Sequence, residues 1–445
     1  MRISDLKISI SGIRGIVGES LTPQLILKFS EAFSTYIGGG KIAVASDTRP
    51  SAEMVKNAVF AGILSCGVSP LDLGILPIPS LQIYTKEKKL DGAISITASH
   101  NPVEWNALKL IRKGGHFLYP LEAEELLDVY YQGRFRRVER PEKIEREHEP
   151  FVTHEQKVLR FVDGELIKTK KIKIVVDPCG GAASPYVQKF LEALGAEVVC
   201  VNCDLKEGFP RNPEPVASNL GDLCKAVRKH KADIGFAQDA DADRLAVVDE
   251  NGIPIGEEYT LALAVNSYLK LKGKSPVVVN LSTSRVLEDV ARMSGVDIFM
   301  SKVGEINVAR KMAEVGAKIG GEGNGGIMVS DIHTCRDSFS GMALLLEYIA
   351  WSGKKLSEIR AELPDYFMMK HKVKASYKDW RKTLSRLTSK YGSGKIQDLD
   401  GLRVDYPDFW FHVRPSNTEP VVRVQVEAKS KELATQEFKK IMEVI

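Results

Sequence analysis

The segment ITASHNP, residues 96–102, places a hydroxyl, an imidazole and an amide directly after an apolar run. These groups belong to Ser99, His100 and Asn101, and Pro102 disfavours helical backbone in the residue before it. The Ser-His pair therefore lies in a loop that follows a predicted strand. Because Ser and Asn are common turn residues, an ordinary capped turn is the preferred interpretation of this loop when it is taken alone.

Three aspartates at alternate positions form the second polar group, in the segment DADADR, residues 239–244. Asp239, Asp241 and Asp243 would share one face of an extended segment. Three carboxylates on one face repel one another unless a cation lies among them, and their hard oxygens suit Mg²⁺ or Ca²⁺. The apolar, strand-like flanks argue against a solvated acidic turn. They also argue against an EF-hand, as does Arg244, which occupies the position where that motif requires glycine.

The loop RPSNTEP, residues 414–420, concentrates hydrogen-bond donors. The donor side chains of this loop, together with an arginine on the next predicted strand, are Arg414, Ser416, Asn417, Thr418 and Arg423. An arginine with several neutral donors and the amides of a turn is what the oxygens of a phosphate require. An ordinary polar turn is the alternative if this loop stands alone.

The fourth loop, GGEGNGG, residues 320–326, contains five glycines, which let a backbone approach a ligand closely. Glu322 and Asn324 are its functional side chains, and both suit the hydroxyl groups of a sugar. The spacing differs from that of a P-loop or a dinucleotide-binding fingerprint. A flexible surface turn is the alternative interpretation.

Three similar units along the chain supply the strands that position these loops. Each unit is a short apolar strand, a helix with apolar residues at three-and-four spacing, a glycine stop and a second apolar strand. The units cover residues 41–74, 171–202 and 275–302. Strands without alternation are buried on both faces, so each unit predicts a βαβ arrangement with a right-handed crossover. In such sheets, ligands bind beyond the carboxyl ends of the strands.

The predicted fold class is α/β, with three related mixed-sheet α/β domains and a smaller α+β C-terminal domain around one central cleft. The C-terminal pattern differs because a helix at 380–391 is followed by three strand-like runs and a last helix, which indicates an antiparallel sheet. We expect the serine in a domain at 1–150, the aspartates at 151–252, the glycine-rich loop at 253–365 and the donor-rich loop at 366–445. Each loop then comes from a different domain.

The composition is that of a globular protein, with 44% hydrophobic and 27% charged residues. A net charge of +4 is small for 445 residues and argues against a dedicated nucleic-acid partner. We expect no signal peptide and no membrane-spanning run, and hence a reduced, cytoplasmic setting. Cys200 and Cys203 form a CxxC, but no second pair stands at zinc spacing, and Cys200 lies in an apolar run typical of a buried thiol. A metal or redox role for the pair is therefore disfavoured.

With all four loops considered, the sequence resembles the α-D-phosphohexomutase family: phosphoglucomutase, phosphomannomutase and phosphoglucosamine mutase. TASHNP is similar to the family's phosphoserine loop, DADADR to its metal loop, GEGNGG to its sugar loop and RPSNTEP to its phosphate-binding loop. The order, the spacing and the four-domain plan match along essentially the whole chain. Four motifs in order are far more specific than any one of them.

The resemblance implies an isomerase that interconverts hexose 1-phosphate and hexose 6-phosphate. Ser99 would carry the phosphoryl group, and Mg²⁺ would be held by a phosphate oxygen on Ser99 and by the three aspartates. A hexose 1,6-bisphosphate, both intermediate and activator, would turn over in the site and return its other phosphate to the serine. The implied partners are small-molecule sugar phosphates, with no nucleic acid and no membrane, and a homodimer is left open.

The same resemblance assigns roles to further residues. Beyond the serine, the catalytic group comprises Lys109, in the position of a general base, Arg14, which would assist it, and His100. The substrate-binding residues are Arg244, beside the phosphoserine, Lys302, Glu322, Asn324, Arg414, Ser416, Asn417, Thr418 and Arg423.

The sequence departs from the common bacterial pattern of the family. The bacterial sugar loop often reads GEMSGH, whereas Asn324 replaces the Ser here and Gly326 the His, so the role of that histidine as acid, base or sugar contact is in question. Trp105, Asn106 and Ala107 stand where the family usually has Tyr-Asn-Gly, and the opening reads ISISGIRG rather than a GTDG-like segment. These departures resemble archaeal-type members, whose sugar preference is mixed, so glucose, mannose and glucosamine phosphates all stay open.

Two other functions are kept as alternatives: a serine-dependent sugar phosphatase, and a non-catalytic sugar-phosphate sensor on the same fold. The intact serine, the three aspartates and Lys109 argue against the sensor. A phosphatase, in turn, has no use for a separate phosphate clamp in the last domain. The mutase is therefore preferred, with the hexose, the oligomeric state and the phosphorylation state left open.

Overall fold

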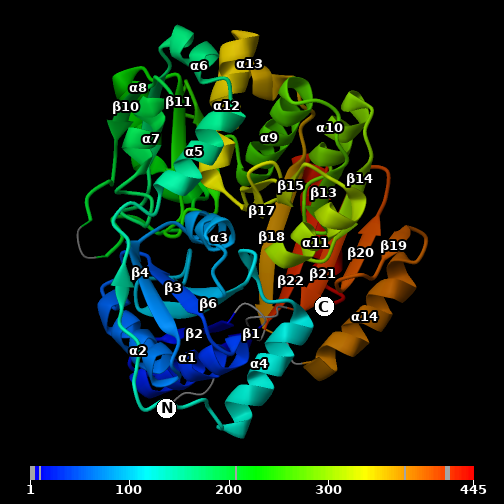
Figure 1. The fold of residues 1–445 in the computed structure, drawn as a ribbon. Helices are drawn as coiled ribbons and strands as arrows, with labels where there is room; N and C mark the ends of the chain where they lie inside the picture. The colour runs from blue at the N-terminus through cyan, green and yellow to red at the C-terminus, as the bar shows by residue number, and fades with distance from the viewer. Residues whose placement is uncertain (1–5, 10–11, 206–207, 375–376, 416–420) are drawn as a thin grey trace.

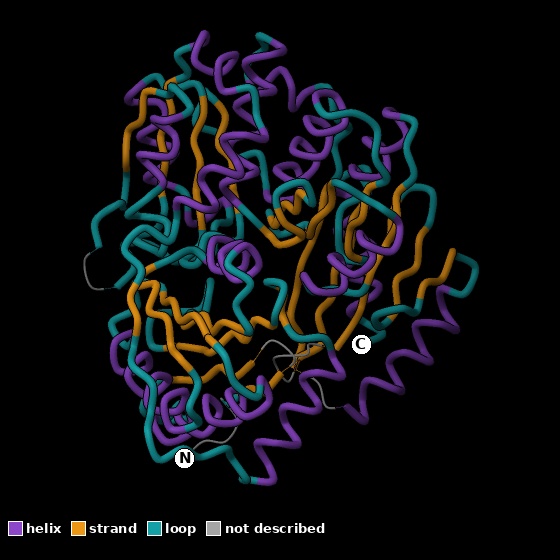
Figure 2. Tube along the Cα trace, in the orientation of Figure 1, coloured by secondary structure: helices purple, strands orange, loops and turns teal. Residues whose placement is uncertain are grey.

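Four sheets organise the chain, of which the computed structural model describes residues 6–9, 12–205, 208–374, 377–415 and 421–445. Each sheet occupies its own part of the view in Figure 1, from blue at the lower left through green at the top to orange and red at the lower right. Helices flank the strands in all four parts (Figure 2). This arrangement confirms the predicted fold class of three α/β domains followed by a smaller α+β domain.

The first domain is built on a mixed sheet with the order β1-β2-β6-β5-β3-β4-β8, with β7 paired to β6. Its strands are β1 (Lys7–Ser9), β2 (Gly12–Ile16), β3 (Lys41–Ser46), β4 (Ser69–Ile75), β5 (Gly92–Ile96), β6 (Trp105–Arg112), β7 (His116–Phe117) and β8 (Glu145–Arg146). Its helices are α1 (Pro23–Ile37), α2 (Ala52–Ser65), α3 (Ile78–Glu87) and α4 (Pro120–Gln132). Because β5 and β6 are antiparallel neighbours, the loop that carries Ser99 joins two adjacent strands of this sheet.

The second domain has four strands in the order β10-β9-β11-β12. They are β9 (Lys173–Asp177), β10 (Glu197–Cys200), β11 (Ile234–Gln238) and β12 (Leu245–Asp249). The helices are α5 (Val152–Phe161), α6 (Gly164–Lys170), α7 (Val187–Ala193) and α8 (Gly221–His230), with a 3₁₀ turn at Ala217–Asn219. The aspartate segment connects the antiparallel strands β11 and β12.

The third domain has five strands in the order β14-β13-β15-β16-β17. They are β13 (Val277–Asn280), β14 (Ile298–Ser301), β15 (Ile319–Glu322), β16 (Gly326–Val329) and β17 (His333–Arg336). The helices are α9 (Glu257–Leu271), α10 (Val286–Ser294), α11 (Glu305–Val315), α12 (Ser338–Ser352) and α13 (Leu356–Ala361). The glycine-rich loop is the tight connection between β15 and β16.

The fourth domain is an antiparallel sheet with the order β18-β22-β21-β20-β19. Its strands are β18 (Phe367–Lys374), β19 (Lys395–Gln397), β20 (Leu402–Asp405), β21 (Phe409–Pro415) and β22 (Val421–Ala428). Two helices, α14 (Tyr377–Tyr391) and α15 (Lys431–Met442), accompany it. The predicted antiparallel C-terminal pattern is confirmed, although the short strand β19 was not anticipated.

All three predicted βαβ units are confirmed. The strand pairs β3–β4, β9–β10 and β13–β14 are parallel, and a helix connects the strands of each pair. The helix of the third unit shows how the sequence sets its end: Gly295 adopts a left-handed φ of 61° and its N–H bonds back to the last turn of α10. Glycine adopts this conformation without the steric cost that a β-carbon imposes, so the chain stops the helix and turns into β14.

One hydrophobic cluster extends through the first three domains, each of which also has a smaller cluster of its own, whereas the core of the fourth domain is separate. The largest buried cluster runs from Ala43 in the first domain through Phe190 in the second to Leu344 in the third. A separate cluster, which includes Trp380 and Val424, lies within the fourth domain. Hydrogen bonds join the third and fourth domains at several points.

A buried polar group connects the first three domains where their elements meet. The Nδ1 atom of His154 on α5 lies 2.8 Å from the hydroxyl of Ser80 on α3, and its Nε2 lies 2.9 Å from Asp337 Oδ2 at the start of α12. All three side chains are buried. A Ser-His-Asp arrangement of this kind would suggest a nucleophile if it faced a pocket. Here its burial makes it a structural tie between domains.

The prediction for the CxxC pair was wrong in one respect. Cys200 is only half-buried, and it forms a disulfide with Cys203 instead of remaining a buried thiol. The apolar run does form β10, but this strand lies at the edge of its sheet, where one side of the strand has no neighbour to cover it. Among the helices of the described residues, none combines the length and the apolar character that crossing a membrane requires.

Candidate active site

Ser99 lies directly after β5 and faces the aspartate segment of the second domain. Its hydroxyl donates a hydrogen bond to Asp239 Oδ2 at 2.8 Å, and its side chain is almost fully buried. The backbone of Ser99 has a φ of 52°, in the left-handed region that residues with a β-carbon rarely adopt. Such strain persists only where the surroundings hold it and is typical of functional sites. The capped-turn interpretation is therefore too weak for this loop.

Arg49 holds the Ser99 loop in place, and the sequence analysis missed it. Its guanidinium donates to four main-chain carbonyls of the loop at distances of 2.5–2.8 Å. The acceptors are the carbonyl oxygens of Ser99, Asn101, Pro102 and Trp105. Its Nε pairs with Asp47 at 2.9 Å, at the end of β3, and both side chains are fully buried. A polar Asp-Thr-Arg run at the carboxyl end of a parallel strand was the available signal.

Arg49→Lys is expected to lower kcat by about 100-fold. A lysine ammonium cannot donate to all four carbonyl oxygens as the guanidinium does. The loop would then shift, and a small misplacement of catalytic groups can lower the rate by about this much. Steady-state turnover at saturating substrate measures this effect. Arg140→Lys, on an exposed segment of the same domain, is the matched control and should behave like the wild type. Wild-type kcat in Arg49→Lys would show that the loop keeps its shape without the guanidinium.

The three aspartates converge, but not for the reason that the sequence suggested. Their segment forms a turn between β11 and β12 rather than an extended strand, and Ala242 has a left-handed φ of 59°. One carboxylate oxygen from each of Asp239, Asp241 and Asp243 lies within 4.8 Å of the others, and all three side chains are buried. Among the described residues, Asp241 Oδ1 and Asp243 Oδ1 are buried without a hydrogen-bond partner. Buried, unsatisfied carboxylate oxygens fit the donor set of a hard divalent cation.

Charges within this cluster perturb its pKa values in opposite directions. Burial, followed by repulsion from the other two carboxylates, raises the pKa of Asp239 well above its usual value. Burial also acts to raise the pKa of Asp241, but the ammonium of Lys109, a hydrogen bond with Asp239 and the charge of Arg336 together bring that pKa below the usual value. The positive charge of Arg244, together with burial, lowers the pKa of His100 well below its usual value. His100, whose Nδ1 lies 3.3 Å from the Ser99 hydroxyl, is thus neutral at physiological pH.

Lys109 reaches the cluster from β6. Its ammonium donates to Asp241 Oδ2 at 2.6 Å and lies 3.9 Å from Asp243 Oδ2. Gly12 on β2 is its partner across the strand pair, and a β-carbon there would lie 1.8 Å from the carbonyl oxygen of Leu108. Only glycine therefore lets β2 pair so closely with the strand that presents Lys109.

Arg14 follows on the same strand, β2, and contacts the Ser99 loop. Its Nη1 donates to Asn101 Oδ1 at 2.6 Å. Arg244 lies on the other side of the cluster, where its backbone N–H donates to Asp239 Oδ1 at 3.1 Å. The structure thus brings Ser99, Lys109, Arg14, His100 and Arg244 into one region with the three aspartates.

Glu322 occupies the end of β15 and is almost fully buried. Its Oε1 accepts hydrogen bonds from Asn280 Nδ2 at 2.8 Å and from the N–H of Gly304 at 2.7 Å. Its Oε2 accepts one from Arg336 Nη1 at 2.9 Å. The carboxylate is therefore fixed in orientation by these three donors. Asn324 differs, because its side-chain oxygen accepts from the N–H of Gly326 and stabilises its own turn.

Arg336 links the sugar loop to the aspartate cluster, and the sequence analysis missed this residue too. Its guanidinium pairs with Glu322, with Glu305 at 3.3 Å and with Asp243. A β-carbon on Gly326 would lie 2.3 Å from Arg336 Cδ. The glycine that replaces the histidine of the bacterial motif therefore makes room for the arginine, which occupies the space beside the loop. No local feature of the sequence signalled this pairing of β16 and β17.

Arg414 and Arg423 are directly opposite each other on the paired strands β21 and β22. Like charges in opposite positions destabilise a strand pair unless an anion lies between them. Arg414 is buried, and burial lowers its pKa from the usual value. This pair fits the predicted phosphate clamp. The other predicted donors, Ser416, Asn417 and Thr418, lie outside the described residues.

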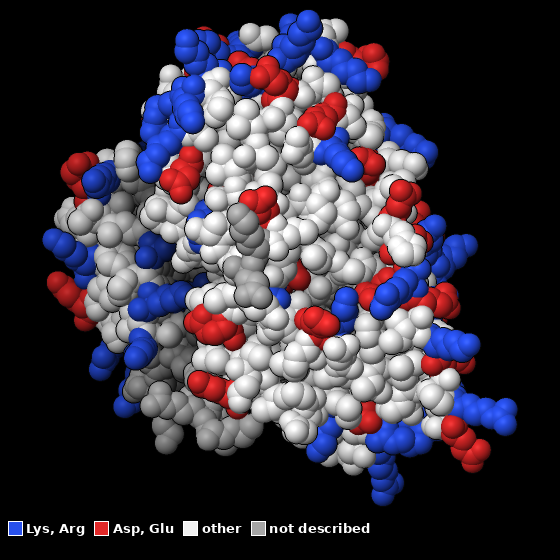
Figure 3. All heavy atoms as spheres, turned by 90° about the vertical axis from the view of Figure 1, so that its left-hand side faces the viewer, with Lys and Arg blue, Asp and Glu red and all other residues white. Residues whose placement is uncertain are grey.

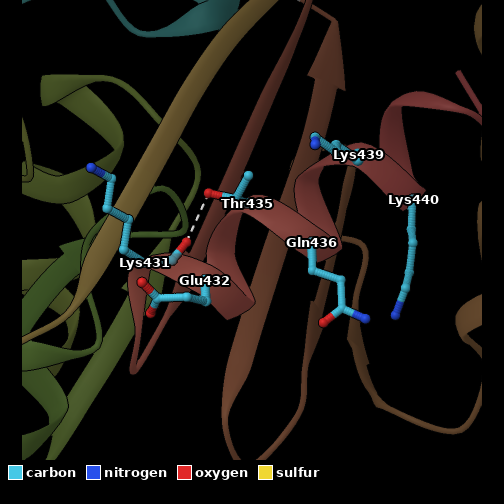
Figure 4. A pocket seen from close by; sticks show the side chains of 6 residues that line it. All are labelled: Lys431, Glu432, Thr435, Gln436, Lys439 and Lys440. Carbon is cyan, nitrogen blue, oxygen red and sulfur yellow. Dashed lines mark hydrogen bonds between the residues drawn. The ribbon is translucent and has the colours of Figure 1, made fainter.

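Lys302, the remaining predicted contact, is exposed at the end of β14. On the face shown in Figure 3, Lys and Arg side chains gather along a recess at the left, whereas both signs of charge are interspersed elsewhere. A different hollow, of about 600 Å³, lies along the outer side of α15 (Figure 4). Its lining residues, among them Lys431, Glu432 and Gln436, point away from the helix and take no part in the site around Ser99.

A buried serine hydroxyl bonds to a three-aspartate cluster, with a lysine beside it and an arginine pair on a separate domain. This arrangement is suited to phosphoryl transfer, which a cation held by the carboxylates would assist. Models of the three alpha/beta/alpha domains of phosphoglucomutase/phosphomannomutase match residues 6–137, 149–252 and 256–367, and the model of the C-terminal domain matches 358–444. The chain therefore belongs to the phosphoglucomutase/phosphomannomutase family of phosphohexomutases, which are isomerases.

Individual relatives and solved structures agree with this assignment. The chain is 38% identical to a phosphoglucomutase/phosphomannomutase of Thermococcus kodakarensis, over 95% of this chain and 94% of that protein. It is 33% identical to a phosphoglucosamine/phosphogalactosamine mutase of Sulfurisphaera tokodaii, over 97% and 98% of the two chains. A crystal structure of a family protein from Burkholderia thailandensis has a TM-score of 0.84 and 27% identity, over 98% and 96%.

A more distant solved structure contains ligands. It is the N-acetylphosphoglucosamine mutase of Aspergillus fumigatus in complex with GlcNAc-6P and magnesium, with a TM-score of 0.59 and 15% identity over 98% of this chain and 95% of that one. The same enzyme, as an S69A variant, has been solved with glucose 1,6-bisphosphate, with a TM-score of 0.62 and 15% identity over 100% and 95%. At this identity the likeness concerns the fold.

Proposed function

We propose that this chain interconverts the 1-phosphate and the 6-phosphate of a hexose by passing the phosphoryl group through Ser99. The observation that carries the proposal is the 2.8 Å hydrogen bond from the Ser99 hydroxyl to Asp239, which joins two domains. It places the only serine of the β5–β6 loop at the buried carboxylate cluster. Neither a sensor nor a turn that merely caps a strand needs this contact.

Asp239, Asp241 and Asp243 would hold a Mg²⁺ ion, together with a phosphate oxygen on Ser99. Buried carboxylate oxygens without a hydrogen-bond partner are suitable ligands for this ion. When bound, the ion neutralises charge on the phosphoryl group that is transferred. The residues around it orient the reacting groups: Arg49 fixes the serine loop and Lys109 fixes Asp241.

The reaction has two halves with the same bond changes. In the first, a hydroxyl oxygen of the hexose phosphate attacks the phosphorus carried by Ser99, and the bond from that phosphorus to Ser99 Oγ breaks. Lys109 is the proposed acceptor of the proton that leaves the sugar hydroxyl. It must act as the neutral amine, so the ammonium that bonds to Asp241 first gives up one proton. In the second half, the hexose 1,6-bisphosphate presents its other phosphate to Ser99. The Oγ atom of Ser99 attacks that phosphorus, the bond from the phosphorus to the sugar oxygen breaks, and the sugar oxygen takes up a proton.

The arginine pair of the fourth domain would bind the phosphate that is not reacting. Arg414 and Arg423 supply opposed positive charges, and charge-assisted hydrogen bonds from them would orient the far end of the sugar. The bisphosphate must bind in two orientations, so the clamp has to accept either phosphate. The separate core of this domain supports opening and closing around the turning intermediate.

Arg414→Ala is expected to raise KM for hexose 1-phosphate by about 10- to 100-fold, because a charge-assisted bond to a dianion contributes roughly 1.5–3 kcal/mol. It should lower kcat as well if this binding energy positions the sugar. Phosphorylation of Ser99 should be unchanged. The matched control is Arg386→Ala, on the exposed side of α14 in the same domain. A wild-type KM in Arg414→Ala would place the clamp elsewhere, first among the basic residues of the third domain.

A coupled assay with and without a trace of hexose 1,6-bisphosphate tests the proposed function. A mutase is stimulated by the bisphosphate and releases the isomeric hexose phosphate, whereas a phosphatase releases inorganic phosphate and a sensor does neither. The assay should be run side by side on glucose, mannose, glucosamine and N-acetylglucosamine 1-phosphates. The relatives are named for different sugars, so this comparison is needed to identify the substrate.

A further inference from the structure

The Cys200–Cys203 disulfide lies outside the site described above. A short series of hydrogen bonds connects it to that site. The Cα atoms of the pair are 5.9 Å apart, within the range that a disulfide requires. Both cysteines are partly exposed, whereas the other four cysteines are free and buried. The pair is therefore accessible to a small thiol reagent in the folded protein, and the others are protected.

Asn202, between the two cysteines, is the residue that the disulfide constrains most directly. It has a left-handed φ of 57°. Its main-chain oxygen accepts from the N–H of Gly180 at 2.6 Å, and its Nδ2 donates to Asp177 Oδ2 at 3.0 Å. The disulfide closes a ring around this residue and so limits how far its backbone can leave that conformation.

Asp177 passes this constraint to the aspartate cluster. It is fully buried at the end of β9, and its Oδ2 also accepts from Arg211 Nε at 2.9 Å. The Nη2 atom of Arg211 donates to the main-chain oxygen of Gln238 at 2.7 Å. Gln238 immediately precedes Asp239, the aspartate that bonds to the Ser99 hydroxyl.

A second series of hydrogen bonds leads from Asn202, through Gly180, toward the loop that carries Ser99. The main-chain oxygen of Gly180 accepts a hydrogen bond from the hydroxyl of Thr48 at 2.6 Å. Thr48 immediately precedes Arg49, whose guanidinium holds the Ser99 loop. Through Asp177 and Gly180, Asn202 therefore stabilises the segments that position the aspartate cluster and the Ser99 loop.

We propose that Cys200 and Cys203 form a reversible thiol–disulfide site that controls how firmly the aspartate segment and the serine loop are held. A small dithiol is the reductant. One of its thiolates attacks a sulfur of the pair and breaks the S–S bond, giving a mixed disulfide. Its second thiolate then displaces the protein sulfur, so the dithiol is oxidised and the two cysteines retain its two protons as thiols. Reduction frees Asn202 from the ring and loosens its bonds to Asp177 and Gly180.

The redox state is established first by counting thiols. The sequence has six cysteines, of which the oxidised chain has four free. Alkylation in denaturant followed by intact mass measurement should add four groups to the oxidised protein and six after treatment with dithiothreitol. Six groups without reductant would mean that the disulfide does not form and would overturn the proposal.

Hydrogen exchange then measures the coupling without relying on turnover. Amides of residues 234–245 should exchange about three- to tenfold faster after reduction, a factor in the range of coupling through such networks. The double variant Cys200→Ser/Cys203→Ser should show the fast exchange with and without dithiothreitol. Asn202→Ala in the oxidised protein should also show it, whereas Asn251→Ala, an exposed asparagine of the same domain, should not. Equal exchange in the oxidised and reduced wild type would overturn the proposal.

The consequence for the enzyme rests on the proposed function and is tested separately. The Mg²⁺ concentration for half-maximal turnover should rise about three- to tenfold on reduction, and should not respond to dithiothreitol in the double variant. A chain that shows the exchange difference but no mutase turnover would contradict the proposed function and leave the redox site standing. A chain with turnover but no exchange difference would contradict the redox site alone.

Discussion

Ser99→Ala is expected to lose about five orders of magnitude in turnover of hexose 1-phosphate, because removal of a covalent nucleophile leaves only binding and electrostatic contributions. The loss should appear in kcat, since the clamp arginines and the sugar loop keep their contacts. A coupled assay with saturating bisphosphate measures it. The fold should be unaffected, because the substitution removes only a hydroxyl, whose partners are Asp239 and His100.

The matched control is Ser69→Ala, at the start of β4 in the same sheet, which should keep wild-type turnover. Circular dichroism and the melting temperature of Ser99→Ala should match those of the wild type to within a few degrees. Ser99→Ala with turnover within tenfold of the wild type would mean that the phosphoryl group does not pass through this side chain. The mutase mechanism proposed above would then be untenable.

Asp241→Asn is expected to lower turnover by about three orders of magnitude, or about 4 kcal/mol of transition-state stabilisation. The amide keeps the shape of the side chain but removes a charge from the cation site. It also neutralises the carboxylate that lies 2.6 Å from the ammonium of Lys109. Activity should recover only in part at high Mg²⁺, because the amide oxygen is a weaker ligand. Turnover as a function of Mg²⁺ concentration, before and after chelation, measures the effect.

Asp222→Asn provides the control for charge and domain. Asp222 lies on α8 of the same domain, is largely exposed and pairs with Lys225 one helical turn away. This variant should have wild-type turnover and an unchanged Mg²⁺ requirement. If Asp241→Asn behaved in the same way, or if excess chelator left the wild type active, the three aspartates would not be the cation site.

The sequence predicted most of the fold because its signals are local. Each βαβ unit shows its period and its glycine stop within one stretch of about 30 residues, and all three units form as expected. The four loops were found for the same reason, since each follows a strand. Their convergence could be expected from the resemblance to the family, but distances such as that from Ser99 to Asp239 depend on how the domains pack.

The features that the sequence did not predict arise from contacts between distant segments. Arg336 reaches Glu322 and Asp243 only because β16 and β17 pair and the glycine at 326 leaves room. The polar Asp-Thr-Arg run after β3 marks the place of Arg49, but it does not reveal that the guanidinium binds carbonyl oxygens of the loop after β5. The aspartates were grouped by an assumed alternation, whereas a turn with a left-handed Ala242 brings them together. In that case the site was predicted for the wrong geometric reason.

Phosphorylation of Ser99 is the central claim, and intact mass spectrometry tests it most directly. The protein is incubated with hexose 1,6-bisphosphate and Mg²⁺, freed of small molecules and weighed beside Ser99→Ala treated in the same way. We predict one phosphoryl adduct on the wild type, located at Ser99 by fragmentation, and none on the variant. A wild type that never gains the adduct, or an adduct that persists in Ser99→Ala, would contradict the account.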